Sequence, residues 1–162
     1  MPAKVRIERL TAPGEGVEAW IDLARRHPKS TIKVGILSGT GEHPNASHGQ
    51  TMAEVGWWNE FGTTRIPERP FLRTGLREQN DKYRLILKKG LKKILVGEST
   101  DTKILALLGA VAVSDVQAKI VAVNSPPNAD LTQEKKGSSS PLIDTGALRQ
   151  HINWAEVQVM HA

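Results

Sequence analysis

Apolar and polar residues alternate in two short segments near the start of the chain and in one near its end. Lys4 to Leu10 alternates in the manner of an edge strand, and Thr31 to Leu37 has the clearest strand pattern in the sequence. Between them, Gly16 to His27 has apolar residues at helical spacing and stops before Pro28, which predicts a short helix. Ile152 to Met160 predicts a closing strand.

The middle of the chain has helical periodicity instead. Thr51 is placed to cap a short helix that ends at Gly62, and Glu54 stands at the capping-box position. A long helix is predicted from Phe71 to about Val96, with Pro70 suited to its first turn. Its apolar face is expected to consist of Leu72, Leu76, Tyr83, Leu87, Leu91 and Ile94.

A second helix is predicted to begin at Thr100 or Asp101 and to reach about Val123. The long helix before it contains Gly75 and Gly90. Each glycine weakens that helix by about 1 kcal/mol unless another element packs closely there.

Polar stretches rich in glycine, proline and serine separate these elements. Residues 38–50 and 124–140 are predicted to be mobile loops, and Asp144 or Thr145 is expected to cap a brief turn of helix. The sequence has no internal repeat and no second-domain boundary. It therefore predicts one α+β domain over residues 1–162, with a small antiparallel or mixed sheet packed against one long and one medium helix.

Composition narrows the functional classes. The chain has no cysteine, which excludes disulfides, thiolate metal sites and thiol nucleophiles. Apolar residues make up 39%, a low share that suits a small core completed by neighbouring subunits. The longest mostly apolar run, Ile104 to Val113, is shorter than the ~20 residues of a membrane span, and the N-terminus lacks an apolar signal stretch. We therefore expect a soluble protein that is made inside the cell.

The net charge of +5 is concentrated in one region. Between Arg65 and Lys93 there are ten Arg or Lys residues and three acidic residues. Five of the basic residues recur every three or four positions and are predicted to share one helix face: Arg73, Arg77, Arg84, Lys88 and Lys92. This face is either a solvated surface or a contact for nucleic-acid phosphates or an acidic partner. No base-reading motif accompanies it, so sequence-specific binding is not expected.

Asp144-Thr145-Gly146 resembles the active-site triplet of retroviral-type aspartic proteases, in which two loops meet in a dimer and their carboxylates share a proton. Such a protease needs several further strands, and only sixteen residues follow Gly146. A helix cap with a packing role is therefore favoured.

Two other patterns are weak. The glycines that follow the strand at Thr31 to Leu37 lack the Gly-Lys-Ser/Thr sequence of a phosphate loop. His43 and His48 lack a third ligand at metal-binding spacing. We predict no catalytic, cofactor-binding or metal-binding residue, and hence no enzyme.

Two segments together resemble a known family. Trp58 to Arg73 reads WNEFGTTRIPERPFLR, and Ser140 to Arg149 reads SPLIDTGALR. In this order and about 70 residues apart, they are similar to motifs of tail-completion and virion-morphogenesis proteins of tailed bacteriophages. The positions that carry the resemblance are Glu60, Phe61, Gly62, Ile66, Pro67, Arg69, Pro70, Phe71 and Leu72, followed by Asp144, Thr145, Gly146 and Leu148.

The resemblance implies a structural ring subunit of the phage neck, of the tail-completion or tail-terminator type, which joins head to tail. It implies a cyclic homo-oligomer, with six-fold symmetry favoured, that contacts the tail tube protein and head-proximal connector proteins. Genome DNA would pass through the lumen without sequence readout. The protein would belong to the virion, be assembled in the host cytoplasm, contact no membrane, and use neither a cofactor nor a catalytic residue.

Trp57 and Trp58 are adjacent, so one helix face cannot bury both. One is expected inside and the other at a subunit contact, where Trp is favoured. Two alternatives remain open. The first is a stand-alone, non-specific nucleic-acid-binding protein that uses the basic helix at residues 71–96, and the less favoured second is the protease.

Overall fold

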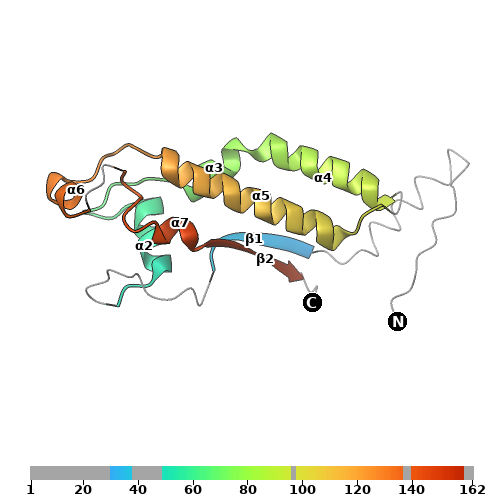
Figure 1. Ribbon diagram of the computed structural model, residues 1–162, viewed down its shortest axis with the longest axis horizontal. Coiled ribbons are helices and arrows are strands. Elements are labelled where there is room, and N and C mark those ends of the chain that lie inside the picture. Colours follow the sequence, from blue (N-terminus) through green and yellow to red (C-terminus); the bar gives the residue numbers. More distant parts are fainter. Residues whose placement is uncertain (1–29, 38–48, 96–97, 137–139, 159–162) are drawn as a thin grey trace, which may run out of the picture.

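The computed structural model describes residues 30–37, 49–95, 98–136 and 140–158 (Figure 1). The strand expected at residues 4–10, the helix expected at 16–27 and most of the loop expected at 38–50 lie outside these ranges. The elements are β1 (Ser30–Ile36), α2 (Met52–Phe61), α3 (Leu72–Glu78), α4 (Asn80–Leu95), α5 (Asp101–Ala122), α6 (Asp130–Lys136), α7 (Ala147–Gln150) and β2 (Ile152–Gln158).

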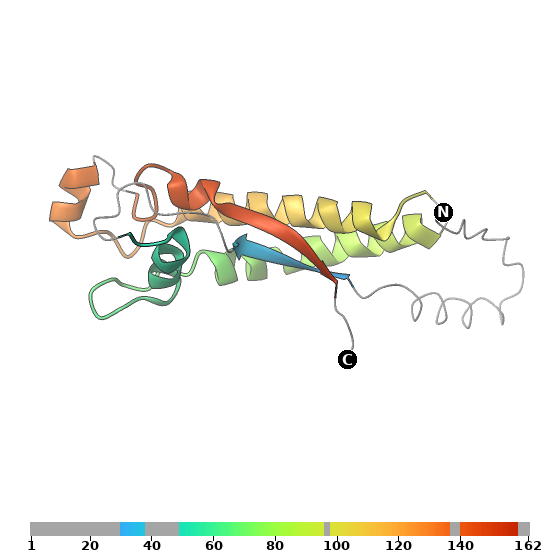
Figure 2. The ribbon, with the colours of Figure 1, turned by 90° about the horizontal axis from the view of Figure 1, so that it is seen from below.

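The described residues form a small α+β fold, as predicted. β1 and β2 pair antiparallel with Val34 opposite Trp154, and α5 packs across one face of this two-stranded sheet. α4 runs back along α5, so the helices and the sheet form elongated layers (Figures 1 and 2). The ring of Trp154 lies against Gly109 of α5, where a Cβ would overlap it. Both strand predictions are confirmed within the described residues.

The predicted capping residues act as expected. The backbone N–H of Glu54 donates to the Thr51 hydroxyl at 3.2 Å, and the backbone N–H of Thr51 donates to the Glu54 carboxylate at 2.8 Å. The bond from the Thr51 N–H, and after it a bond from the Thr51 hydroxyl to the same carboxylate at 2.9 Å, hold the pKa of Glu54 below its ordinary value. Gly62 ends α2 with φ 73°, a conformation that glycine adopts without strain. Thr100 caps α5.

The prediction of one helix from Phe71 to Val96 is wrong. The helix is interrupted at Gln79, which has φ −102° and ψ 10° and ends α3. Each half packs separately on α5, with Gly75 of α3 against Lys119 and Gly90 of α4 against Ile104. Both glycines are therefore sites of close helix contact, which accounts for their presence in helices. Pro70 precedes the cap residue Phe71 and is not in the first turn.

The main core lies where α2, α3, α5, α7 and β2 meet. Its buried side chains are Met52, Phe71, Val116, Ile120, Leu142, Ala147, Leu148 and Ile152. α4 extends beyond this core and turns Tyr83 and Gly90 inward, whereas Leu87 and Leu91 are 42% and 54% exposed. The predicted apolar face is thus wrong at these two leucines, because the interruption at Gln79 resets the helix face that meets α5.

Two further expectations need correction. The segment 124–140 is not only loop, because it contains the short helix α6. The apolar helix α5 is longer than the run Ile104 to Val113, and by length and composition it could span a bilayer. Core helices of soluble proteins share that property, and the row of Ile104, Leu108, Ala112, Val116 and Ile120 on α5 is buried inside the subunit.

Candidate functional site

The two motif segments, about 70 residues apart in the sequence, meet in space. α2 and the link at residues 62–71 lie beside the segment 140–148, and both line one cavity of about 370 Å³. Asn59, Arg69, Asn128 and Asp144 contribute the polar part of its wall. Val55, Ile66, Leu142 and Leu148 contribute apolar side chains.

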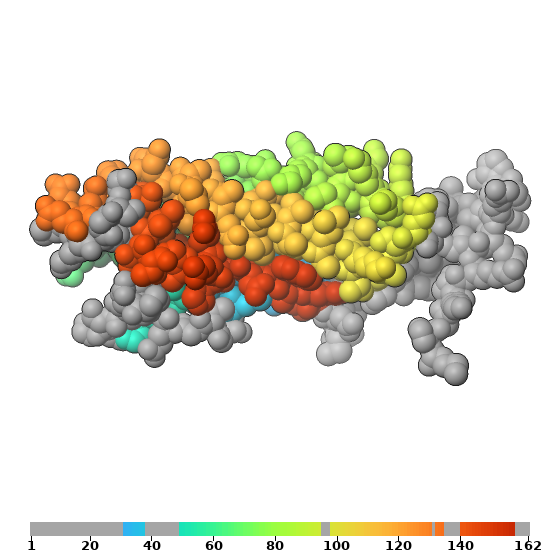
Figure 3. Space-filling model, in the orientation of Figure 1, coloured from blue at the N-terminus to red at the C-terminus, as the bar shows by residue number. Residues whose placement is uncertain are grey.

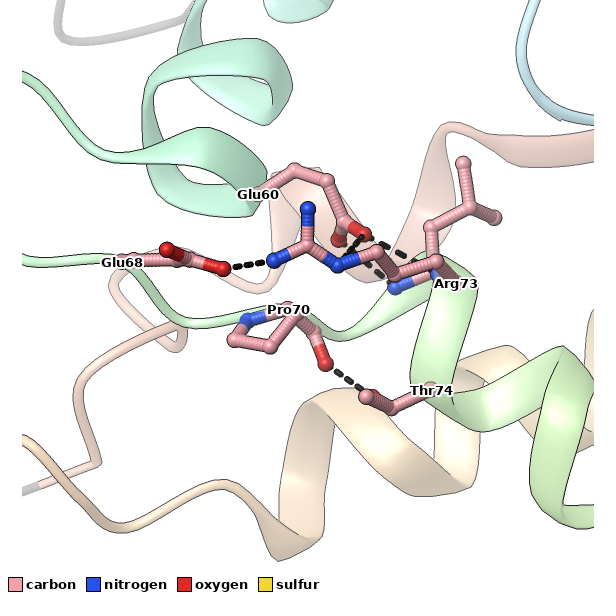
Figure 4. Close-up of polar contacts among 6 residues, drawn as sticks. Glu60, Glu68, Pro70, Arg73 and Thr74 are labelled. Atoms are coloured by element: carbon pink, nitrogen blue, oxygen red, sulfur yellow. Dashed lines mark hydrogen bonds and ion pairs between the residues drawn. The ribbon is translucent and has the colours of Figure 1, made fainter.

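Glu60 holds the start of α3. Its side chain projects from the last turn of α2 and is only 5% exposed. Its carboxylate accepts the backbone N–H of Leu72 at 2.8 Å and that of Arg73 at 3.0 Å (Figure 4). These are the first two amides of α3 and have no partner within the helix. A buried carboxylate at the positive end of a helix is therefore stabilised both by hydrogen bonds and by the helix dipole.

Arg69 holds the loop that follows α5. Its guanidinium donates to the carbonyl of Pro126 at 2.6 Å and to that of Pro127 at 2.9 Å, with a longer bond to Asn59 at 3.4 Å. The side chain is 2% exposed, and burial lowers the pKa of Arg69 from its ordinary value. Arg69 also donates its backbone N–H to the Asn59 carbonyl at 2.7 Å. It therefore joins α2, the link and the loop at residues 124–129.

The link between these two charged residues is a set of tight turns. Thr63 donates its N–H to the Ile66 carbonyl at 2.7 Å, and its hydroxyl accepts the Ile66 N–H at 2.9 Å. Gly62 lies against this turn, where a Cβ would come within 3.1 Å of the Ile66 oxygen. Thr74 bonds the carbonyl of Pro70 (Figure 4). Together these bonds fix the path from α2 to α3.

An aromatic patch, formed by Trp57 and Phe61, covers the outer side of α2. The two side chains are 62% and 48% exposed, and their ring centroids are 4.2 Å apart. Arg73 lies 5.2 Å from the Phe61 centroid and forms ion pairs with Glu60 and Glu68. A shallow apolar cavity of about 230 Å³ adjoins the patch. Exposed Trp and Phe beside an Arg are typical of protein contact surfaces.

The Asp144 segment differs from the expected cap. Gly146, with φ 80°, occupies the cap position of α7, and the Thr145 hydroxyl accepts the Ala147 N–H at 3.3 Å. Asp144 is half-buried and lines the larger cavity instead. A left-handed conformation is needed at that point of the chain, and glycine supplies it where Asp or Thr would be strained.

The other motif residues differ in burial. Phe71 and Leu148 are in the core, whereas Pro67 and Thr145 are exposed. The half-buried motif residues are Gly62, Ile66, Pro70, Leu72 and Gly146. Sequence reasoning missed the roles of Asn59, Pro126, Pro127 and Asn128, whose contacts depend on the fold. The proline pair and the polar residues around it mark this loop in the sequence but say nothing of its partner Arg69.

The basic residues fall into two groups. Arg73 is engaged in the motif region, and Arg77 lies exposed on α3. Arg84, Lys88 and Lys92 lie exposed on α4, with Arg84 at 3.7 Å from Asp81. The five residues therefore belong to two helices and not to one continuous helix face.

Within the described ranges, no group of three or more His, Asp or Glu side chains is placed to hold a metal ion. No protein-family model, curated protein or solved structure matches this chain.

Proposed function

We propose that this chain is a structural ring subunit of a tailed-phage neck, in the tail-completion or tail-terminator group. Its partners would be further copies of itself in a ring, with six-fold symmetry favoured. The tail tube protein and head-proximal connector proteins would bind the ring on either side. The protein would reside in the virion, after assembly in the host cytoplasm, with genome DNA in its lumen.

One observation carries the proposal. The buried charged residues of the motif region, Glu60 and Arg69, bond to main-chain groups of neighbouring elements. Such contacts fix the angles between elements, and they engage both charged groups with main-chain partners. A part that must fit between other proteins needs a fixed geometry of this kind.

The aromatic patch on α2 supplies a surface for subunit contact. Trp57 is more exposed than any other large hydrophobic side chain among the described residues, while its neighbour Trp58 is half-buried. This division is the one expected when one Trp stabilises the subunit and the other contacts a neighbour.

Electron microscopy of the purified protein and of phage particles tests the proposal. Because Trp57 is 62% exposed but stacks on Phe61, Trp57→Ala should lower the free energy of unfolding by only about 1 kcal/mol. It should nevertheless weaken ring assembly by about thirtyfold or more, as loss of an interface hot spot does. Leu85→Ala is the control, since Leu85 is 50% exposed but lies on α4. A protein that is monomeric at every concentration and absent from mature particles would refute the proposal.

A second candidate is a stand-alone nucleic-acid-binding protein, favoured by the exposed Lys88, Lys89, Lys92 and Lys93 of α4. Strong, salt-sensitive DNA binding by isolated subunits would support it. A protease of the retroviral type would need several strands after Asp144, and within the described residues only α7 and β2 follow it. Loss of a peptidase activity in Asp144→Asn would support that assignment instead.

A further inference from the structure

The aromatic patch on α2 is suited to a partner of mixed apolar and cationic character. Trp57 is 62% and Phe61 48% exposed, and the shallow apolar cavity of about 230 Å³ lies beside them. The patch already holds one cation of its own subunit, because the Arg73 guanidinium lies 5.2 Å from the Phe61 centroid. Exposed Glu54 lies three residues before Trp57 and therefore shares its side of α2.

One flank of α4 offers this mixed character. It consists of four exposed residues that share one side of the helix: Arg84, Leu87, Lys88 and Leu91. Leu87 is 42% and Leu91 54% exposed, and Figure 3 shows side chains of α4 projecting along one edge of the molecule. Leu85 is also exposed, but it lies about 120° around the helix from Leu91. We call the four residues the basic flank of α4.

The two surfaces have complementary charge. α4 contains six basic residues and one acidic residue, whereas α2 contains two acidic residues and no basic one. Within the described ranges, Glu54 bonds to Thr51 but pairs with no basic residue, and Lys88 pairs with no acidic one. We infer that the basic flank of α4 in one copy of this chain packs against the aromatic patch of the next copy.

In this contact the leucines and the aromatic rings are the anchors. Leu87 and Leu91 pack against Trp57, Phe61 and the adjoining cavity, where desolvated aromatic side chains dominate the affinity of an interface. An exposed ion pair between Lys88 and Glu54 adds little affinity, but it orients the two copies and speeds their association. DNA is a poorer occupant of the flank, because phosphates would satisfy its cations and leave both leucines exposed.

The contact joins two different surfaces, so it repeats from copy to copy. Figures 1 and 2 place α2 and α4 in different halves of the elongated subunit, so that one copy can use both surfaces at once. A head-to-tail contact of this kind forms a ring where the rotation between copies closes. The inference rests on the proposed function and names the second surface of the ring contact.

A mixture of two assembly-deficient variants tests the pairing. Trp57→Ala removes the patch, and Leu91→Asp places a carboxylate in the apolar part of the flank. Each variant should weaken self-association about thirtyfold or more in sedimentation, while circular dichroism shows a folded subunit. An equimolar mixture keeps one intact contact, between the patch of the Leu91→Asp copy and the flank of the Trp57→Ala copy. It should therefore form dimers and no rings, whereas the matched control Leu85→Ala should assemble as the wild type does.

Carbodiimide coupling, which joins a carboxylate directly to an amine, tests the register. Glu54 of one copy should couple to Lys88 of another, as read by mass spectrometry on a mixture of isotope-labelled and unlabelled protein. Lys89 is the control. It is also exposed but lies about 100° around the helix from Lys88, so it should couple at least about tenfold less.

The inference is overturned if Leu91→Asp assembles as the wild type does, if the mixture stays monomeric, or if the wild type is monomeric at high micromolar concentration. Equal coupling of Lys88 and Lys89 would also overturn it. Rings that persist in Leu91→Asp would leave the neck assignment standing without this contact. Conversely, copies that pair as inferred but are absent from mature particles would support the contact and contradict the neck assignment.

Discussion

The clearest consequence of the structure concerns Glu60. Its carboxylate is buried and accepts two backbone N–H groups at the start of α3. Glu60→Ala removes both acceptors, whereas Glu60→Gln keeps one oxygen but turns an amide N–H₂ toward the second backbone N–H. Comparison of the two variants therefore separates the loss of both hydrogen bonds from the loss of one.

The magnitudes follow from the two bonds. A hydrogen bond to a charged group contributes about 1.5–3 kcal/mol, and its loss leaves a buried donor unsatisfied. At the low end of that range, Glu60→Ala should lower the free energy of unfolding by about 3 kcal/mol, and Glu60→Gln by about 1.5 kcal/mol. The weak pairing with Arg73, at 3.8 Å, adds little to either value.

Urea unfolding followed by tryptophan fluorescence measures these changes, since Trp57 and Trp58 lie on the same helix as Glu60. Glu68→Gln is the matched control. Glu68 also pairs with Arg73 but is 52% exposed, so its loss should cost less than about 1 kcal/mol. If Glu60→Gln were as stable as Glu68→Gln, the carboxylate would not hold α3 and the reasoning would fail.

Three further predictions concern other side chains. Arg69→Lys should lose about 2 kcal/mol of stability in the same assay, because one ammonium cannot reproduce the guanidinium's bonds to two carbonyls. Burial, aided by the nearby Asp115 carboxylate, raises the pKa of Tyr83. The stability that neutral Tyr83 contributes is fully present below about pH 10 and is lost as the pH rises through the pKa of Tyr83 in the folded protein. The free energy of unfolding of Tyr83→Phe should therefore fall less at alkaline pH than that of the wild type. An ordinary midpoint in the absorbance titration of this sole tyrosine would contradict that claim. Replacing Arg77, Arg84 and Lys88 with Gln should leave a folded ring that joins heads to tails, or retains DNA, less well; unchanged particle yield at all salt concentrations would identify a solvated surface.

Local sequence rules predicted the two ends of α2 and the start of α5, whereas the cap expected at Asp144 or Thr145 and the first-turn position expected for Pro70 are wrong. Thr51 with Glu54, and Thr100, act through hydrogen bonds within three residues, and Gly62 acts through its own backbone conformation, so their roles can be inferred without the fold. The strand at Thr31 to Leu37 was equally clear, because its alternation matches a sheet that packs on one face only.

Features that depend on tertiary contacts could not be predicted. The interruption at Gln79 leaves the apolar periodicity almost unbroken, and it is the separate packing of Gly75 and Gly90 on α5 that divides the helix. Arg69 was identified only as a motif residue. Its partners, the carbonyls of Pro126 and Pro127, are 57 and 58 residues away and are main-chain groups with no side-chain signal.

The two buried charges together determine how the surfaces of the subunit are oriented. Glu60 fixes the angle between α2 and α3, and Arg69 ties α2 and its link to the loop that leaves α5. The aromatic patch on α2 is therefore held at a set angle to α3 and to the end of α5. An assembly of defined symmetry requires contact surfaces in such a fixed relation. Loss of the hydrogen bonds of Glu60 or of Arg69 should broaden the range of oligomers that form, even under conditions in which the subunit remains folded.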